Sequence, residues 1–166
     1  MNGMLRILLL CLCMACLLGV SACSSKRISA YGPSQQAMRQ YTMGQRVVQT
    51  AQKQIGRKYR FGGESPSGGF DCSGLIWWAY RVNGINVPRV TGDQAGAGVR
   101  VPPRYAQPGD ILVFKTGRLW GGLHTALYVG NGRFIHSPSS GKRVRIDSLA
   151  SDYWGPRLRD VRRIVR

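Results

Sequence analysis

The hydrophobic period of this sequence changes once along the chain, and the change limits what the chain can fold into. Two segments, 42–55 and 72–82, carry apolar side chains at the three- and four-residue spacing of amphipathic helices. Beyond residue 110 the apolar residues form short strand-like runs separated by Gly, Pro and Asn, at 111–115, 124–129, 133–137, 144–146 and 161–165. Helices followed by strands predict an α+β fold, with N-terminal helices packed on a small antiparallel β-sheet, rather than alternating βαβ units.

Boundary signals support both helices. Thr42 and Gln45 have the spacing of a capping box, Gly56 is a stop signal, and the expected buried face is Val47, Val48, Ala51 and Ile55. The second helix starts at Cys72 and stops at Asn83-Gly84, with an expected buried face of Leu75, Ile76, Ala79 and Val82. This pattern places Cys72 in the first helical turn. The two tryptophans of the same helix, Trp77 and Trp78, are expected to pack against the sheet.

The N-terminal segment predicts export. Residues 7–20 form an uncharged apolar run after Arg6, which is the pattern of a secretory signal and is short for a transmembrane span. The run closes on Val20-Ser21-Ala22-Cys23, which resembles the lipobox of bacterial lipoproteins. That resemblance implies a signal peptide over 1–22 and a lipid on Cys23. Cys16 is a weaker candidate for lipidation, and an uncleaved signal anchor is the alternative.

The segment after the lipobox predicts a spacer between membrane and domain. Residues 23–41 contain few large apolar side chains after Cys23, so we expect a lipidated cysteine followed by a flexible tether. The globular domain is predicted at 42–166. Ser24 resembles the outer-membrane default of Gram-negative lipoprotein sorting. We therefore expect a protein of the bacterial cell envelope, lipid-anchored to the outer membrane and facing the periplasm.

The charge balance predicts anionic partners. The chain has 24 lysines and arginines against 7 aspartates and glutamates, a net charge of +17. The basic residues are spread along the chain, without a helix-turn-helix, RNA-binding or zinc-finger pattern beside them, so we expect no nucleic acid partner. Cell-wall polymer, an anionic membrane surface and lipopolysaccharide all fit the charge.

Cys72 is the solitary thiol of the predicted domain. Cys11, Cys13 and Cys16 fall within the signal, and Cys23 would carry the lipid. At a helix N-terminus the free N–H groups and the helix dipole lower a cysteine pKa, and the same N–H groups can receive an oxyanion. Cys72 is therefore a candidate nucleophile. A small, inert, buried residue is the alternative that the local sequence leaves open.

Both histidines of the chain lie in one predicted hairpin. A two-residue Asn131-Gly132 turn would direct His124 and His136 to opposite faces of the sheet. A three-residue loop of Gly130, Asn131 and Gly132 would pair 129 with 133 and place both rings on one face. We expect the second arrangement, in which one imidazole acts as base and the other orients it. A zinc site with Cys72 and an ordinary buried histidine are the alternatives.

Six motifs in fixed order resemble the NlpC-type cell-wall cysteine peptidases, a papain-like superfamily of peptidoglycan hydrolases. The resemblance spans residues 45–166. The motifs are Tyr59-Arg60-Phe61-Gly62-Gly63, Asp71-Cys72-Ser73-Gly74, Pro88-Arg89 with Gln94 downstream, Gln107-Pro108-Gly109-Asp110, His124 to Gly130, and Arg133-Phe134-Ile135-His136-Ser137.

The resemblance implies a role for each motif residue. Cys72 would be the nucleophile, His124 the general base, and His136 the polar residue that holds the ring of His124. Tyr59 would help the backbone N–H of Cys72 to stabilise the oxyanion. The positions that line the substrate groove in family members are Asp71, Ser73, Arg89 and Gln94. No metal or organic cofactor is implied, and we expect a monomer.

The implied reaction is hydrolysis of an amide bond in peptidoglycan, either D-Glu–diaminopimelate within a stem peptide or D-Ala–diaminopimelate across a cross-link. Two departures from the family pattern bear on substrate: Lys58 replaces the usual proline before Tyr59, and Leu123-His124-Thr125-Ala126 replaces the usual Ser-His-Val-Gly. Two other functions stay open. One is a catalytically silent wall-binding lipoprotein, and the other is a related amidase or acyltransferase.

Overall fold

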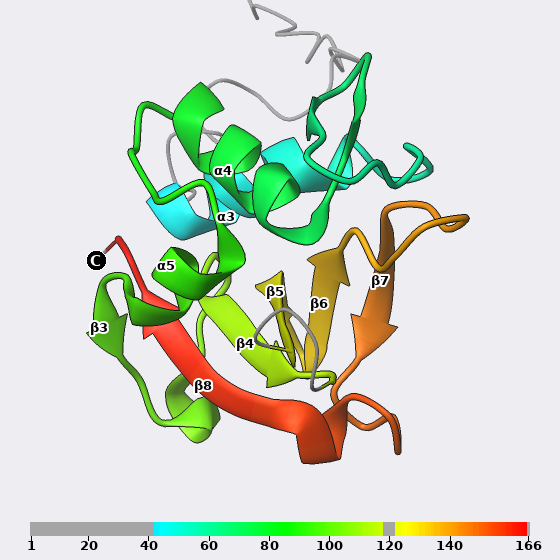
Figure 1. Cartoon of the computed structure of the whole chain (residues 1–166). Coiled ribbons are helices and arrows are strands. Elements are labelled where there is room, and N and C mark those ends of the chain that lie inside the picture. The colour runs from blue at the N-terminus through cyan, green and yellow to red at the C-terminus, as the bar shows by residue number, and fades with distance from the viewer. Residues whose placement is uncertain (1–41, 118–121, 166) are drawn as a thin grey trace, which may run out of the picture. The chain divides into compact units, whose positions relative to one another are not determined.

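Helices cover one face of a six-stranded antiparallel sheet in the computed structural model, which describes residues 42–117 and 122–165 (Figure 1). The helices are α3 (Met43–Gln52), α4 (Cys72–Val82) and the short α5 (Thr91–Gly96). The sheet has the order β3-β8-β4-β5-β6-β7. The predicted α+β class, with helices before the sheet, is confirmed. The signal peptide, Cys23 and the tether lie outside the described residues.

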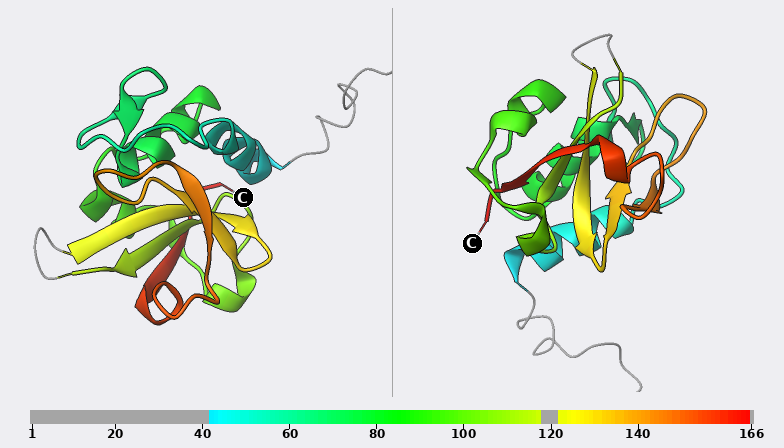
Figure 2. Two further views of the ribbon diagram at one scale, coloured as in Figure 1. Left: turned by 90° about the vertical axis from the view of Figure 1, so that its right-hand side faces the viewer. Right: turned by 90° about the horizontal axis from the view of Figure 1, so that it is seen from below.

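Neighbouring strands of this sheet follow one another in sequence, except that the last strand of the chain lies between the first two. They are β3 (Val99–Arg100), β4 (Ile111–Lys115), β5 (Leu123–Gly130), β6 (Arg133–His136), β7 (Arg145–Ser148) and β8 (Leu158–Arg163). Figure 2 shows from two other sides that the helices stay on one side of the sheet. A small separate hairpin, β1 (Glu64–Ser65) with β2 (Gly69–Phe70), precedes α4.

The two predicted helices form, but one residue of each expected buried face is exposed. The Thr42–Gln45 capping box is present, and Asp71 caps α4, so Cys72 is its first residue. Ile55 lies beyond the end of α3 and is 50% exposed, because the chain leaves the helix at Lys53. Val82, at the last position of α4, is 59% exposed. The expected burial of Ile55 and Val82 is therefore wrong.

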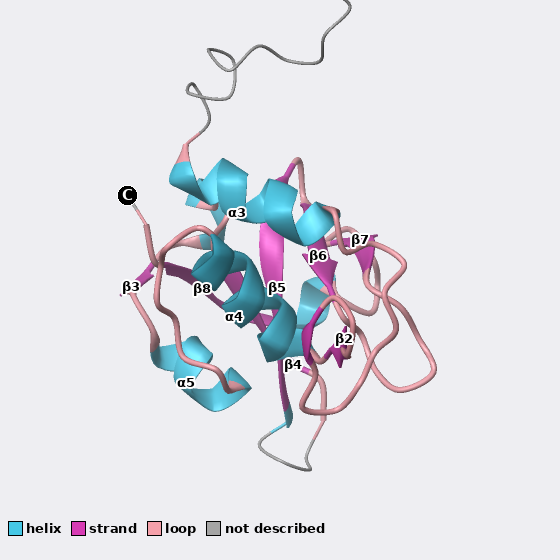
Figure 3. Ribbon diagram, turned by 90° about the horizontal axis from the view of Figure 1, so that it is seen from above, coloured by secondary structure: helices cyan, strands magenta, loops and turns pink. Residues whose placement is uncertain are grey.

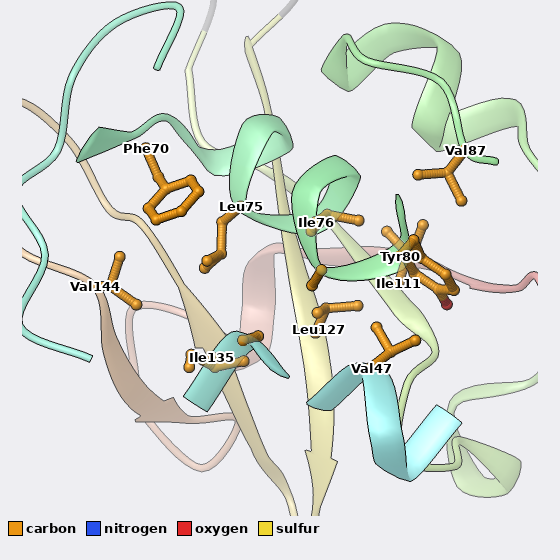
Figure 4. Packing of buried hydrophobic residues seen from close by; sticks show 12 residues of the cluster. Val47, Phe70, Leu75, Ile76, Tyr80, Val87, Ile111, Leu127, Ile135 and Val144 are labelled. Carbon is orange, nitrogen blue, oxygen red and sulfur yellow. The ribbon is translucent and has the colours of Figure 1, made fainter. Parts of the chain in front are cut away.

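The core lies between the helices and one face of the sheet. Seen from above, α3 and α4 lie across the sheet, whereas α5 lies apart from them (Figure 3). Val47 of α3, with Leu75 and Ile76 of α4, packs on Leu127 and Ile135 of the sheet (Figure 4). A second cluster covers the opposite face of the sheet and includes Phe114, Ala126, Phe134, Trp154 and Val161. The sheet is thus packed on both faces.

The turn of the β5–β6 hairpin differs from the expected one, but the two histidines still lie on one face of the sheet, as expected. Gly130 pairs with Arg133 across a two-residue turn, in which Asn131 and Gly132 have φ of 52° and 68°. Tyr128 then pairs with Phe134, so a β-bulge inserts one extra residue in β5. The predicted three-residue loop is wrong. The bulge nevertheless restores the parity that places His124 and His136 on one face.

The remaining elements carry no strong apolar period and were not expected from the sequence. They are α5, the strands β1, β2 and β3, and two 3-10 turns, at Pro103–Tyr105 and Gly155–Arg157. Trp78 packs against Phe70 at the edge of the core in a tilted arrangement, with ring centroids 5.4 Å apart. In the described part of the chain, no helix is both long and apolar enough to cross a membrane.

Candidate active site

Asp71 fixes the start of the helix that carries Cys72. Its Oδ1 accepts the N–H of Gly74 at 2.6 Å, and its Oδ2 accepts the N–H of Gly62 at 2.9 Å. Arg89 donates to both carboxylate oxygens at 3.1 and 3.0 Å, and also to Glu64 at 2.8 Å. This cap joins the preceding loop, the helix start and Arg89 into one charge-compensated cluster.

Gly74 allows the preceding loop to lie against the first turn of α4. A Cβ at this position would overlap the carbonyl oxygen of Gly63. The same oxygen accepts the N–H of Asp71 at 3.0 Å and an Arg89 N–H at 3.2 Å. A side chain at Gly74 would therefore displace the loop from the helix that presents Cys72.

The Cys72 thiol is partly buried and has a hydroxyl beside it. Its Sγ lies 3.4 Å from Oγ1 of Thr91, at the start of α5. Thr91 was not among the expected site residues, because nothing in its local sequence connects it to Cys72. The first-turn N–H of Cys72 has no intrahelical acceptor, as for any residue at this helical position.

Tyr59 lies near the thiol and is a hydrogen-bond donor at neutral pH. Partial burial raises its pKa above the ordinary value, and the charges of Cys72 and Asp71 raise it further. A phenol with a raised pKa keeps its proton and can donate to an oxyanion. The backbone N–H of Tyr59 donates to the carbonyl of Lys142 at 2.9 Å, which ties this residue to the β6–β7 connection.

His124, His136 and Asp147 form a continuous hydrogen-bonded chain. Nε2 of His124 lies 2.8 Å from Nδ1 of His136, and Nε2 of His136 lies 3.0 Å from Oδ2 of Asp147. The two imidazole rings are nearly perpendicular, at 88°. Trp154 also donates its indole N–H to Oδ2 of Asp147 at 3.0 Å, and Arg145 contacts both oxygens. Asp147 is therefore held by three partners.

Packing holds both rings in place. His124 and His136 lie on the face of the second hydrophobic cluster, where the ring of Trp154 is 5.3 and 4.9 Å from their ring centroids. Phe114 and Phe134 complete an aromatic enclosure around the pair. The side chain of His136 is fully buried. Neither ring can turn without displacing a neighbouring aromatic side chain.

The surroundings keep both imidazoles neutral at neutral pH. Burial lowers the pKa of His124 below its ordinary value, and the neighbouring His136 lowers it further, against an opposing effect of Asp147. Burial likewise lowers the pKa of His136, although Asp147 opposes the shift. Burial acts to raise the pKa of Asp147, but Arg145 and His136 outweigh it and hold that pKa below the ordinary value.

These protonation states fix the direction of every hydrogen bond in the chain. An ionised Asp147 can only accept, so His136 carries its single proton on Nε2. Nδ1 of His136 must then accept from Nε2 of His124. A neutral His124 is left with an unprotonated Nδ1, and no hydrogen bond engages that nitrogen within residues 42–117 and 122–165. His124 is thus prepared to act as a base through Nδ1.

Gln94 joins the helix of the thiol to the strand of the base. Its amide N–H₂ donates to the carbonyls of Ser73 at 3.0 Å and Pro88 at 2.8 Å, and its oxygen accepts from the hydroxyl of Thr125 at 3.0 Å. Ser73 follows Cys72, and Thr125 follows His124. Gln94 is fully buried, so its side chain offers no surface to a substrate, and its expected place in the groove is replaced by this bridging role.

The structure groups the expected site residues into two clusters. Tyr59, Asp71, Ser73 and Arg89 surround Cys72, with the Ser73 hydroxyl bonded to Asp71 and Arg89. His124 and His136 form the second cluster with Asp147. No hydrogen bond joins Cys72 to His124 among the described residues, although α4 packs against β5. In the same residues, no group of three or more histidine, cysteine or acidic side chains is placed to hold a metal ion.

Asp147 is the main residue that the sequence analysis missed. It lies one position beyond the predicted strand 144–146, in a stretch without a motif. In the structure Arg145 pairs with His136 and Asp147 with Phe134 across β6 and β7, so the Asp147 side chain is diagonal to His136 on the same face. The alternation of side chains along these two strands would have identified Asp147 if the register between the strands had been known.

The chain is similar to known proteins over the region that contains these residues. The model of the NlpC/P60 family matches residues 56–163. The gamma-DL-glutamyl hydrolase of Bacillus subtilis is 42% identical over 118 residues, which cover 70% of this chain and 28% of that protein. The murein DD-endopeptidase MepH of Escherichia coli is 39% identical over 116 residues, covering 68% of this chain and 43% of that protein.

Solved structures share the fold. The crystal structure of a Staphylococcus aureus protein, described as similar to lipoprotein and of the NLP/P60 family, superposes with a TM-score of 0.66 and 36% identity. The match covers 75% of this chain and 42% of that one. The papain-like arrangement expected of this α+β domain is thereby confirmed. The chain spans less than half the length of these three proteins.

The neutral histidine pair predicts that acid destabilises the domain. In the unfolded chain each imidazole takes up a proton near pH 6.5, whereas the folded pKa values are lower, so the unfolded state binds more protons as pH falls. Stability is therefore complete above pH 6.5 and declines below it. Between pH 7.5 and 5.5 we expect a loss on the order of 1 kcal/mol in the free energy of unfolding per histidine.

Urea denaturation at the two pH values measures this loss. The chain contains only these two histidines, so a His124→Asn/His136→Asn variant should show a much flatter pH dependence. A wild-type stability that stays constant or rises on acidification would contradict the neutral pair.

Proposed function

Since this chain belongs to the NlpC/P60 family, we propose that it is a cysteine peptidase that hydrolyses an amide bond of peptidoglycan. The bond is D-Glu–diaminopimelate of a stem peptide or D-Ala–diaminopimelate of a cross-link. The observation that carries the proposal is the directed hydrogen-bond chain from Asp147 through His136, which leaves Nδ1 of His124 unprotonated. A buried pair of histidines with this polarity is suited to accept a proton from a thiol.

The first half of the reaction transfers an acyl group to Cys72. Nδ1 of His124 takes the thiol proton, and the thiolate attacks the amide carbon. The oxyanion accepts hydrogen bonds from the Cys72 N–H and the Tyr59 hydroxyl. The resulting imidazolium of His124 gives its proton to the departing amine as the carbon–nitrogen bond breaks, which leaves a thioester.

The second half returns the enzyme to its starting state. His124 removes a proton from water, the water oxygen attacks the thioester carbon, and the thiolate departs. The thiolate regains a proton from His124, and the acyl half leaves as a carboxylic acid. The missing hydrogen bond between Cys72 and His124 agrees with this scheme, because catalytic hydrogen bonds often tighten only in the substrate complex.

Residues around the thiol would position the acyl half of the substrate. Arg89 and Asp71 are partly exposed, whereas Ser73 is buried and would act by holding them. We also propose that Cys23 carries a lipid that keeps the enzyme at the cell envelope, in line with the lipobox. The basic surface would hold the domain on anionic wall polymer or lipid.

Digestion of purified peptidoglycan tests the activity. The protein should release muropeptide fragments, and Cys72→Ala should lower the rate by a factor on the order of 10³ or more, because no other nucleophile replaces the thiol. Mass spectrometry of the products identifies the bond that is cut. Wall binding by both proteins without any cleavage would contradict the peptidase and favour a binding lipoprotein, whereas cleavage at the sugar–peptide junction would favour an amidase.

The cysteine at the lipobox provides a matched variant. Cys23→Ser should digest peptidoglycan at the wild-type rate in solution but leave the membrane fraction of the cell, because only the anchor is removed. Fractionation followed by immunoblotting measures the distribution. A Cys23→Ser protein that stays in the membrane fraction would contradict the lipid anchor.

Substitution of Asp147 should have a catalytic effect that substitution of a purely structural residue would not have. The substitution Asp147→Asn introduces an amide that can donate to Nε2 of His136 and so reverse the direction of the hydrogen-bond chain. It should therefore lower kcat on the order of 10- to 100-fold with little change in KM. Loss of the negative charge should also move the acid limb of the kcat/KM profile to lower pH, because Asp147 raises both histidine pKa values.

Two variants control for charge and folding. Asp147→Glu keeps a carboxylate and should recover part of kcat. Asp160→Asn removes a carboxylate that pairs with Arg100 and Arg162 away from the site, and should leave kcat unchanged. If Asp147→Asn has wild-type kcat, or loses activity only in proportion to its unfolded fraction, the positioning role is wrong.

A further inference from the structure

A cavity of about 630 Å³ opens beside His124, on the side of the site formed by β7 and the segment that follows it. Its walls include Lys142, Arg145, Asp147, Ser148 and Ser151. We propose that this cavity binds a carboxylate group of the departing half of the substrate. The inference rests on the proposed function, because it places a second part of the same substrate.

The two sides of the site differ in unpaired charge. Beside Cys72, the Arg89 guanidinium is already paired with Asp71 and Glu64. Beside His124, Arg145 is paired with Asp147, but Lys142 makes no ion pair with any residue in 42–117 or 122–165. Lys142 therefore leaves the cavity with one uncompensated positive charge. An anionic group would be favoured on this side and not on the other.

Lys142 is held at the cavity by its backbone. Its N–H donates to the carbonyl of Ser139 at 3.1 Å, and its carbonyl accepts from Tyr59 at 2.9 Å. Its positive charge reaches the active site, since it contributes to the lowered pKa of His136. The backbone of Lys142 is thus fixed beside the cavity, and its flexible side chain can bring the ammonium to a ligand there.

Two hydroxyl groups in the cavity wall are available as donors. Oγ of Ser148 accepts the N–H of Ala150 at 3.1 Å, and Oγ of Ser151 accepts the N–H of Tyr153 at 3.2 Å. Each hydroxyl keeps its own hydrogen to donate. The Asp147 oxygens, by contrast, are occupied by Arg145, His136 and Trp154. An ammonium and two O–H groups supply the positive charge and the hydrogen-bond donors that a carboxylate accepts.

The chemistry of the reaction decides which half of the substrate reaches this cavity. His124 must protonate the departing amine, so the departing half lies on the His124 side. In both candidate bonds the departing amine belongs to diaminopimelate. That residue has a carboxylate at its D-centre that is free in either bond. The proposed ligand is therefore this carboxylate.

Direct binding tests the cavity without requiring cleavage. The full chain with Cys72→Ala is titrated with meso-diaminopimelate and with its dicarboxamide, in which neutral amides replace both carboxylates, and the indole N–H resonance of Trp154 in the cavity wall reports binding by NMR. Adding Lys142→Gln should raise the Kd for diaminopimelate by about two- to five-fold, the size expected of one exposed charge pair. Adding Lys53→Gln instead removes the same charge outside the cavity and should leave the Kd unchanged.

Cleavage provides the second readout. Muropeptides with a free carboxylate at the D-centre are compared with the same muropeptides amidated at that carboxylate. The active protein should prefer the free acid, and Lys142→Gln should reduce that preference by about two- to five-fold, whereas Lys53→Gln should retain it.

The outcomes separate the two proposals. Dependence of binding on Lys142 and on the carboxylate supports the cavity, even if no muropeptide is cut, in which case the proposed function alone falls. If muropeptides are cut but neither binding nor preference depends on Lys142, the carboxylate site is wrong and the peptidase stands. Equal binding of the dicarboxamide also overturns the site.

Discussion

The hydrogen bond between His124 and His136 is the interaction on which the rest of the site depends. It joins two residues twelve apart in sequence, and it forms only because both side chains point to the same face of the sheet. The Asn131-Gly132 turn alone would separate them, and the bulge between Tyr128 and Gly130 reverses that effect. One extra residue in one strand thus brings the two imidazoles of this hairpin into hydrogen-bonding contact.

Beyond the hairpin, the fold holds each end of the site with hydrogen-bonded polar side chains. Asp147 anchors the histidine pair from β7 and sets its proton direction, while Asp71 anchors the helix of Cys72. Gln94 connects the two parts by bonding to residues next to Cys72 and next to His124. Buried, fully satisfied polar groups of this kind specify one geometry, because each lost partner leaves an unpaired group in a low-dielectric interior.

The two sides of the site differ in charge. On the side that would hold the acyl half, Asp71 and Glu64 compensate the positive charge of Arg89, whereas on the side that would hold the departing half no acidic residue of 42–117 or 122–165 pairs with Lys142. A peptide with a free carboxylate on its amine side would therefore be oriented before reaction. Orientation of this kind contributes to rate as well as affinity, because the reacting atoms are positioned in advance.

The sequence predicts the reactive residues of this site better than the residues that hold them in place. Cys72 and both histidines follow from residue type, helix position and strand parity, and the main strands follow from their apolar period. Thr91, Gln94 and Asp147 could not be assigned their roles, because each depends on tertiary pairing between distant segments. Ile55 and Val82 were misplaced for a simpler reason: the apolar period continues to the helix end, where the surface no longer faces the core.

The protonation of the two imidazoles tests the central claim most directly. Nitrogen-15 NMR of the chain, which contains only these two histidines, distinguishes the tautomers of each ring. Both rings should be neutral at pH 7, with the proton on Nε2 and an unprotonated Nδ1. A proton on Nδ1 of His136, or an imidazolium at either ring, would contradict it.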